Sequence, residues 1–179
     1  MITNAHQILW IYDELDINLD TLGAVMAKLN SPNLNILEDW LYYAKDKQKF
    51  WIDGEVGENS HVTLKYGFLR GVKKEHVDTV LKGWELSDIY KKEVMVFDSP
   101  YEDEPYKCIV LAMESSSFYE ANRLLNFLPN VSTFKNYVPH MSLAYVKKEH
   151  VDEAVGYVKS VINRYQPRII GLDYGDQIK

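Results

Sequence analysis

Two short segments of the sequence carry residues that could do acid–base chemistry. The first is His61-Val-Thr-Leu64, and the second is His140-Met-Ser-Leu143, with the same order of histidine, apolar residue, hydroxyl residue and leucine. Side chains alternate across a strand, so the histidine and the hydroxyl of each segment would point to one side and the apolar residues to the other. Imidazole titrates near neutral pH, and hydroxyls donate hydrogen bonds. Two such strands facing one cleft would supply an acid, a base and two donors.

This set of groups fits the cleavage of a phosphodiester. One histidine would take the proton from an attacking hydroxyl or water while the other protonates the leaving oxygen. The hydroxyls would hold the non-bridging phosphate oxygens and stabilise the charge that builds on them. We therefore expect His61, Thr63, His140 and Ser142 to be catalytic, with no metal or cofactor required. Which histidine is the acid and which the base stays open.

Four further residues are candidate substrate contacts. Lys65 continues the histidine side of the first segment and could meet a phosphate. Tyr12, Trp51 and Tyr137 could each stack on a base. Two of them have a structural alternative: Lys65 as an exposed lysine at a strand end, and Tyr12 as a half-buried core aromatic.

Other reactive side chains fit structural roles. His76 and His150 stand among charges where helices are expected to begin, so we interpret them as solvated helix ends. Cys108 lies in an apolar run and fits packing better than nucleophilic attack. The chain has neither a Gly-x-Ser-x-Gly turn nor a Gly-x-x-x-x-Gly-Lys loop.

An internal repeat relates the two histidine segments. Val72-Lys-Lys-Glu-His-Val-Asp78 and Val146-Lys-Lys-Glu-His-Val-Asp152 are identical over seven residues. Each copy follows one of the expected histidine strands and precedes an amphipathic helix. The repeat therefore predicts two lobes related by an approximate two-fold axis, each offering one histidine strand to a shared cleft.

Hydrophobic spacing gives the elements that must position these residues. Alternation predicts strands over residues 8–12, 61–68, 94–97, 106–113, 140–146 and 168–172. Helical spacing predicts helices from Asp20 to about 30, from 34 to about 50, from 73 to about 81, from 115 to about 128, and from about 148 to 165. The first of these helices is predicted from apolar residues at positions 22, 25, 26 and 29. In the strand that begins at His140, we expect Met141, Leu143 and Tyr145 to share the apolar face.

Composition and charge limit the functional classes. The chain has 179 residues, 46% hydrophobic and 26% charged, which predicts one globular domain over residues 1–179. Its 26 acidic and 20 basic residues give a formal charge of −6, so we expect it to repel long nucleic acids and to grip a short nucleotide locally. No apolar run is long enough to span a membrane and no secretory signal is visible, so we expect a cytoplasmic protein without a membrane partner. The oligomeric state stays open.

The paired motif resembles the 2H phosphoesterase superfamily, which includes the bacterial 2′-5′ RNA ligase-like proteins. The resemblance implies an α+β fold of two pseudo-symmetric antiparallel-sheet lobes around a central cleft, with helices outside. It also implies metal-independent cleavage of cyclic or 2′-5′ phosphodiesters in nucleotides, with His61 and His140 as acid and base. Thr63 and Ser142 would bind the phosphate. The long segment before His61 departs from the family and could roof the cleft.

The run His61-Val-Thr-Leu-Lys-Tyr-Gly67 and the acidic chain are similar to the phage anti-CBASS nucleases within this family. Those enzymes destroy the cyclic di- and trinucleotide messengers of bacterial antiviral signalling, which would place the protein in the host cytoplasm. Two alternatives stay open: an RNA-end processing enzyme that opens 2′,3′-cyclic phosphates, and a non-catalytic protein that binds and sequesters a nucleotide.

Overall fold

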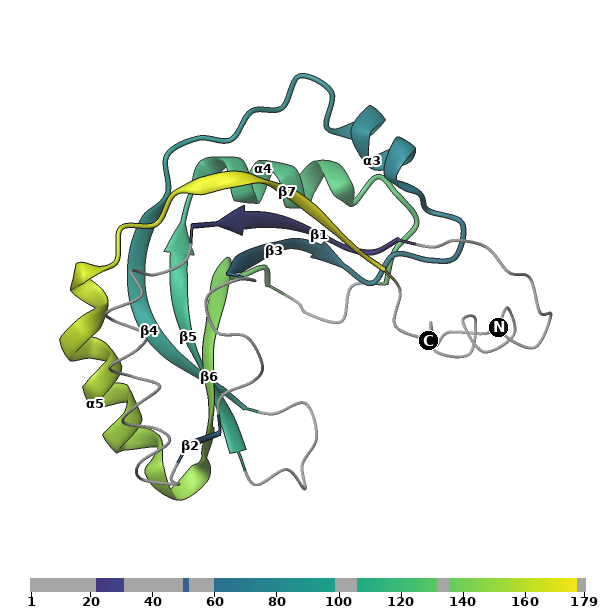
Figure 1. Ribbon diagram of the computed structural model, residues 1–179. Helices are drawn as coiled ribbons and strands as arrows, with labels where there is room; N and C mark the ends of the chain where they lie inside the picture. The colour runs from purple at the N-terminus through teal and green to yellow at the C-terminus, as the bar shows by residue number, and fades with distance from the viewer. Residues whose placement is uncertain (1–21, 31–49, 52–59, 99–105, 132–135, 177–179) are drawn as a thin grey trace, which may run out of the picture.

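The computed structural model describes residues 22–30, 50–51, 60–98, 106–131 and 136–176. Within these residues the fold is α+β, with two antiparallel sheets and three α-helices (Figure 1). No helix in the described ranges is long and apolar enough to cross a bilayer.

The first sheet has three strands in the order β3-β1-β7, and the second has four in the order β2-β6-β5-β4. The strands are β1 (Leu22–Leu29), β2 (Phe50–Trp51), β3 (His61–Tyr66), β4 (Tyr90–Asp98), β5 (Tyr106–Glu114), β6 (His140–Lys147) and β7 (Ile169–Asp176). The helices are α3 (Lys74–Val80), α4 (Ser116–Leu125) and α5 (Val151–Val161), and the last is flanked by the 3-10 turns Lys148–His150 and Ile162–Arg164.

Strand β1 occupies the segment that the sequence predicts as a helix after Asp20, so this prediction is wrong. Val25, Ala27 and Leu29 are buried and alternate with the half-buried Met26 and Lys28. The apolar residues of the segment fit a helical as well as a two-residue period, which leaves the sequence ambiguous. β1 is the central strand of its sheet and pairs with both β3 and β7. This pairing on both sides overrides the helix propensity of its alanines, methionine and leucines.

The remaining expectations inside the described ranges are confirmed, with shifted ends. Strands are present at 61–66, 90–98, 106–114, 140–147 and 169–176, and helices at 74–80, 116–125 and 151–161. The expected strand at 8–12 and helix residues 34–49 lie outside the described residues. Phe50, expected at the end of that helix, instead begins β2.

The two identical heptapeptides fold in different ways. The copy Val72–Asp78 enters α3 at its third residue, Lys74. In the copy Val146–Asp152 the first two residues still belong to β6, the next three form the turn Lys148–His150, and α5 begins only at Val151. The first valine of each copy is buried. The repeat therefore gives each helix a similar apolar anchor without giving it the same start.

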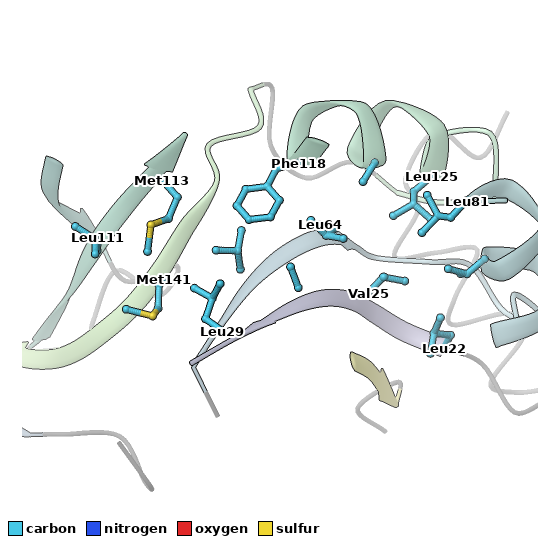
Figure 2. Packing of buried hydrophobic residues seen from close by; sticks show 14 of the residues in the cluster. Leu22, Val25, Leu29, Leu64, Leu81, Leu111, Met113, Phe118, Leu125 and Met141 are labelled. Atoms are coloured by element: carbon cyan, nitrogen blue, oxygen red, sulfur yellow. The ribbon is translucent and has the colours of Figure 1, made fainter. Parts of the chain in front are cut away.

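The helices pack on one side of the two sheets (Figure 1). α4 contacts β3 and α3, whereas α5 contacts β4, β5 and β6. The main core lies beneath α4 and combines residues of α4 with residues of both sheets (Figure 2): Val25, Val62, Leu64, Leu111, Met113, Phe118, Leu125 and Met141. A second core lies beneath α5: Ile109, Ala144, Val146, Ala154 and Val158. Because the main core draws on both sheets, their opposite faces also lie on a common side of the molecule.

Candidate active site

The two motif strands meet although they belong to different sheets. β3 and β6 contact each other, and Figure 1 shows their first residues side by side in the middle of the molecule. Val62 and Met141, which follow the two histidines, are both buried in the main core. Alternation therefore turns both histidines to the side away from that core. We call this side of the two sheets, away from both cores, the histidine face.

Each motif supplies its hydroxyl residue to the same face. Thr63 is opposite Met26 of β1, and Ser142 is opposite Val110 of β5. His61, Thr63 and His140 are half-buried, whereas Ser142 is exposed. The described structure thus places two imidazoles and two hydroxyls on the histidine face, as the strand alternation predicts.

Strand β3 has a bulge directly after Thr63. The pairing passes from Thr63 opposite Met26 to Lys65 opposite Val25, which leaves Leu64 as an extra residue. At such a bulge two consecutive residues face one partner, and the alternation reverses beyond it. Leu64 and Lys65 are accordingly both buried, and the following residue is exposed.

Strand β6 has a bulge at the corresponding place. Its pairing passes from Ser142 opposite Val110 to Ala144 opposite Ile109, which leaves Leu143 as the extra residue. Met141 and Leu143 pack against the main core as expected, but Ala144, directly after the bulge, is buried in the second core, so the apolar face does not continue on the odd-numbered positions. Both motifs therefore share a bulge as well as an order of residue types.

Lys65 does not lie on the histidine face, contrary to the sequence prediction. Only 5% of the residue is exposed, so the alternative of an exposed strand-end lysine is also wrong. Its Nζ donates to Asn126 Oδ1 at 2.6 Å, at the C-terminal cap of α4. Burial lowers the pKa of this amine. The physical reason is the bulge, which turns Lys65 towards the helix, where the C-terminal end of α4 favours a cation.

Tyr66 takes the place that the sequence assigns to Lys65. It pairs with Ala24 on the histidine side of β1 and is 58% exposed. The sequence contains a signal that points to it, because both motifs continue to a tyrosine five residues after the histidine, Tyr66 and Tyr145. Tyr145 occupies the register position opposite Cys108 of β5.

His140 is held in one orientation by its backbone neighbourhood. Its Nδ1 lies 2.7 Å from the carbonyl oxygen of Val138, and its ring contacts Phe97 edge-on with centroids 4.7 Å apart. A carbonyl only accepts hydrogen bonds, so Nδ1 carries the hydrogen and Nε2 is the nitrogen left to exchange a proton with a substrate.

Tyr137 connects the two motifs. It lies three residues before His140, and its hydroxyl donates to the backbone oxygen of Thr63 at 2.9 Å. Its ring packs against the main core and meets Tyr119 edge-on. Burial, followed by the nearby Tyr119, raises its pKa above the usual range. These contacts show a structural role for Tyr137 that the sequence did not suggest.

Of the other two aromatic candidates, Trp51 and Tyr12, the structure describes only the backbone of Trp51. Trp51 lies in β2, where its backbone pairs with Tyr145 of β6. Its side chain and the whole of Tyr12 lie outside the part of the chain that the structure describes.

Lys28 is a residue that the sequence analysis missed. It pairs directly with His61 across β1 and β3, so both side chains point to the histidine face. The prediction of a helix around position 28 concealed this relation, because it removed β1 from the sheet.

The residues given structural roles in the sequence analysis keep them where they are described. His76 Nδ1 accepts the backbone N–H of Lys73 at 3.0 Å at the start of α3. Cys108 is buried. Within the described ranges, no group of three His, Cys, Asp or Glu side chains could hold a metal ion.

No protein-family model matches the chain, and no curated protein is significantly similar to it. The arrangement itself provides two imidazoles for proton transfer and two hydroxyls for oxygen binding on one face.

Proposed function

We propose that this protein is a phosphodiesterase of the two-histidine type, a member of the 2H phosphoesterase superfamily, acting on small cyclic nucleotides or short oligonucleotides. The observation that carries the proposal is the matched pair of motif strands. Both turn a histidine and a hydroxyl to the histidine face, and both have a bulge at the following leucine. The two antiparallel sheets, with helices on their outer side, would be the two lobes of that family's fold.

The reaction divides between the two imidazoles. One accepts the proton of the attacking hydroxyl or water as its oxygen bonds to phosphorus. The other donates a proton to the leaving oxygen as the second P–O bond breaks. For His140 the nitrogen involved is Nε2, since Nδ1 is engaged by Val138. The hydroxyls of Thr63 and Ser142 donate to the non-bridging oxygens, and this set requires no metal ion.

The charge of the chain favours a compact substrate. A formal charge of −6 disfavours long polyanions, whereas a cyclic di- or trinucleotide carries only a few phosphates. Together with the resemblance of the first motif to phage anti-CBASS nucleases, this makes the cyclic nucleotide messengers of bacterial antiviral signalling our first choice of substrate.

The test is a mass-spectrometric screen of cyclic mono-, di- and trinucleotides with and without excess chelator. We expect turnover to persist in chelator and to fall by at least about 10²-fold in His61→Ala and in His140→Ala. The exposed His76 gives a matched control, and His76→Ala should keep wild-type turnover.

The outcomes separate the alternatives. Turnover of 2′,3′-cyclic nucleotides alone would favour RNA-end processing. Calorimetric binding of a cyclic nucleotide without product would identify a sequestering protein, and an absence of turnover across the whole panel would refute the enzyme proposal.

A further inference from the structure

The histidine face of the three-stranded sheet is built of rows that run across its strands. Directly paired residues of an antiparallel sheet point to the same side. The rows contributed by β3 and β1 are His61 with Lys28, Thr63 with Met26, and Tyr66 with Ala24. Successive rows are about 6.6 Å apart, because each strand residue advances about 3.3 Å. The first of these rows is therefore charged, and the third, two rows away from His61, is apolar.

The first row places a cation beside the histidine. Cross-strand neighbours have Cβ atoms about 5 Å apart, so the ammonium of Lys28 can reach a phosphate held at His61. On its other flank Lys28 is opposite Gly171 of β7. A Cβ added to Gly171 would meet nothing within 4 Å, which leaves open space beside the lysine.

In the third row, the two positions next to Tyr66, on β1 and β7, are low and apolar. Ala24 is opposite Gly175 of β7. A Cβ built on Gly175 would lie 3.4 Å from Met26 Cε and 3.7 Å from Ala24 Cβ. The thioether of Met26 therefore reaches across this row and forms a floor without tall side chains. Such a floor suits an aromatic ring, and thioethers make favourable contacts with aromatic rings.

Tyr66 stands next to this floor and is largely exposed. A large exposed aromatic side chain beside a flat apolar area supplies a stacking partner for a base, whatever the base. Among the described residues, Asp173 of β7 is exposed and opposite Met26, so it also belongs to this face, and its Oδ1 accepts the backbone N–H of Tyr174. It lies in the middle row, between the positions for phosphate and base.

We propose that the three rows bind one nucleotide of the substrate, with its phosphate at Lys28 and His61 and its base on Met26 and Gly175 against Tyr66. The middle row then lies under the sugar. This inference rests on the proposed function and extends it, because it makes a nucleobase next to the scissile phosphate a requirement for tight binding. Lys28 acts on the phosphate, whereas Tyr66 and Gly175 act on the base.

The test compares a nucleoside 2′,3′-cyclic phosphate, a cyclic dinucleotide and ribose 2′,3′-cyclic phosphate, which lacks the base. Tyr66→Ala and Gly175→Val should raise KM for the nucleotides by roughly 5- to 150-fold, the range for a lost stacking contact. Both variants should leave kcat/KM for the base-free compound within about twofold. Lys28→Met should lower kcat/KM for all three compounds.

Matched controls exclude a general loss of fold. Gly156 in α5 is exposed and also has open space around it, so Gly156→Val makes the same chemical change far from the face. It should leave every KM unchanged. Circular dichroism and thermal unfolding of each variant show whether it is folded, and a folded Tyr66→Ala with unchanged nucleotide KM would overturn the proposal.

The same variants distinguish this proposal from the function it rests on. If the wild type cleaves none of the compounds, the proposed function fails. Binding of a nucleoside 5′-monophosphate to the three rows is then measured by calorimetry. Binding that weakens in Tyr66→Ala and Gly175→Val, but not in Gly156→Val, supports the nucleotide site. No binding by the wild type, or equal binding by all variants, overturns it.

Discussion

At the scale of single residues, Tyr137 shows how one hydroxyl can couple the two motifs. It stands just before β6 and donates to the backbone oxygen of Thr63 in β3. Its raised pKa keeps the hydroxyl protonated, and therefore donating, throughout the neutral and mildly alkaline range. The bond fixes the position of one motif strand against the other without contacting the proposed substrate.

Replacing Tyr137 by phenylalanine should slow catalysis while leaving substrate affinity almost unchanged. The variant loses one hydrogen bond, which should cost about 1 kcal/mol in the free energy of unfolding. Small displacements of catalytic groups are costly, so we expect kcat to fall roughly 10- to 100-fold with KM within about twofold. Steady-state kinetics and urea unfolding measure the two effects.

Tyr119→Phe is the control, because it keeps the edge-on ring contact with Tyr137 and should leave kcat unchanged. A Tyr137→Phe variant that loses stability but keeps the wild-type kcat would show that the bond is only structural.

At the scale of elements, the paired bulges decide which side chains belong to the site. Without the bulge in β3, strict alternation would place Lys65 on the same side as the hydroxyl of Thr63 and Tyr66 in the core. With it, the lysine binds Asn126 beneath α4 and the tyrosine faces out. Bulges are common next to active sites because they redirect side chains.

Lys65→Met should therefore leave kcat/KM within about twofold of the wild type. Methionine has a similar length and no charge to desolvate, and the exposed Asn126 can bond to water once the ammonium is gone. We expect the free energy of unfolding to stay within about 1 kcal/mol of the wild type or to increase.

The matched comparison is Lys28→Met, the same substitution one strand away but on the histidine face. A Lys65→Met variant that loses activity as strongly as Lys28→Met would contradict the reversed alternation of β3.

At the scale of the whole molecule, Tyr165 connects the segment between α5 and β7 to both sheets. The residue is 1% exposed, and its hydroxyl donates to the backbone oxygen of Asn30, directly after β1, at 2.8 Å. The same hydroxyl lies 3.9 Å from the sulfur of Met141 in β6. Burial raises the pKa of Tyr165 to about 12. The hydroxyl of Tyr165 thus lies between the end of β1 and β6, at a place where its ionisation is unfavourable.

From the raised pKa of Tyr165 we expect the free energy of unfolding to decrease at alkaline pH. The unfolded tyrosine ionises near pH 10, whereas the folded one holds its proton to about pH 12. Its contribution to stability is therefore complete below pH 10 and declines as the pH rises through 12, by roughly 2–3 kcal/mol. Urea unfolding of the wild type and of Tyr165→Phe between pH 8 and 12 measures it, and the difference between the two should shrink over this window.

Tyr90→Phe, at an exposed tyrosine of β4, controls for the loss of a phenol and should follow the wild type. A constant difference between the wild type and Tyr165→Phe up to pH 12 would contradict the raised pKa.

Much of the described fold could be predicted from local patterns. The alternation in the two histidine segments predicts the strands that begin at His61 and His140, and helical spacing predicts the three helices. Prediction failed where two periods fitted the same residues, as in β1, and where alternation was interrupted, as at Lys65. In both places the deciding hydrogen bonds come from strands distant in the sequence.

The sequence by itself determined which reactive groups are available, namely two histidines and two hydroxyls. It also determined that the histidine and the hydroxyl of each strand point to one face, because apolar residues alternate with them. The tertiary structure decided what surrounds them. Strand pairing made residues 22–29 the central strand of a sheet and brought Lys28 beside His61. It also placed Tyr66, instead of Lys65, on the histidine face. Strand register depends on partners that local sequence does not specify, whereas alternation is a property of the strand alone.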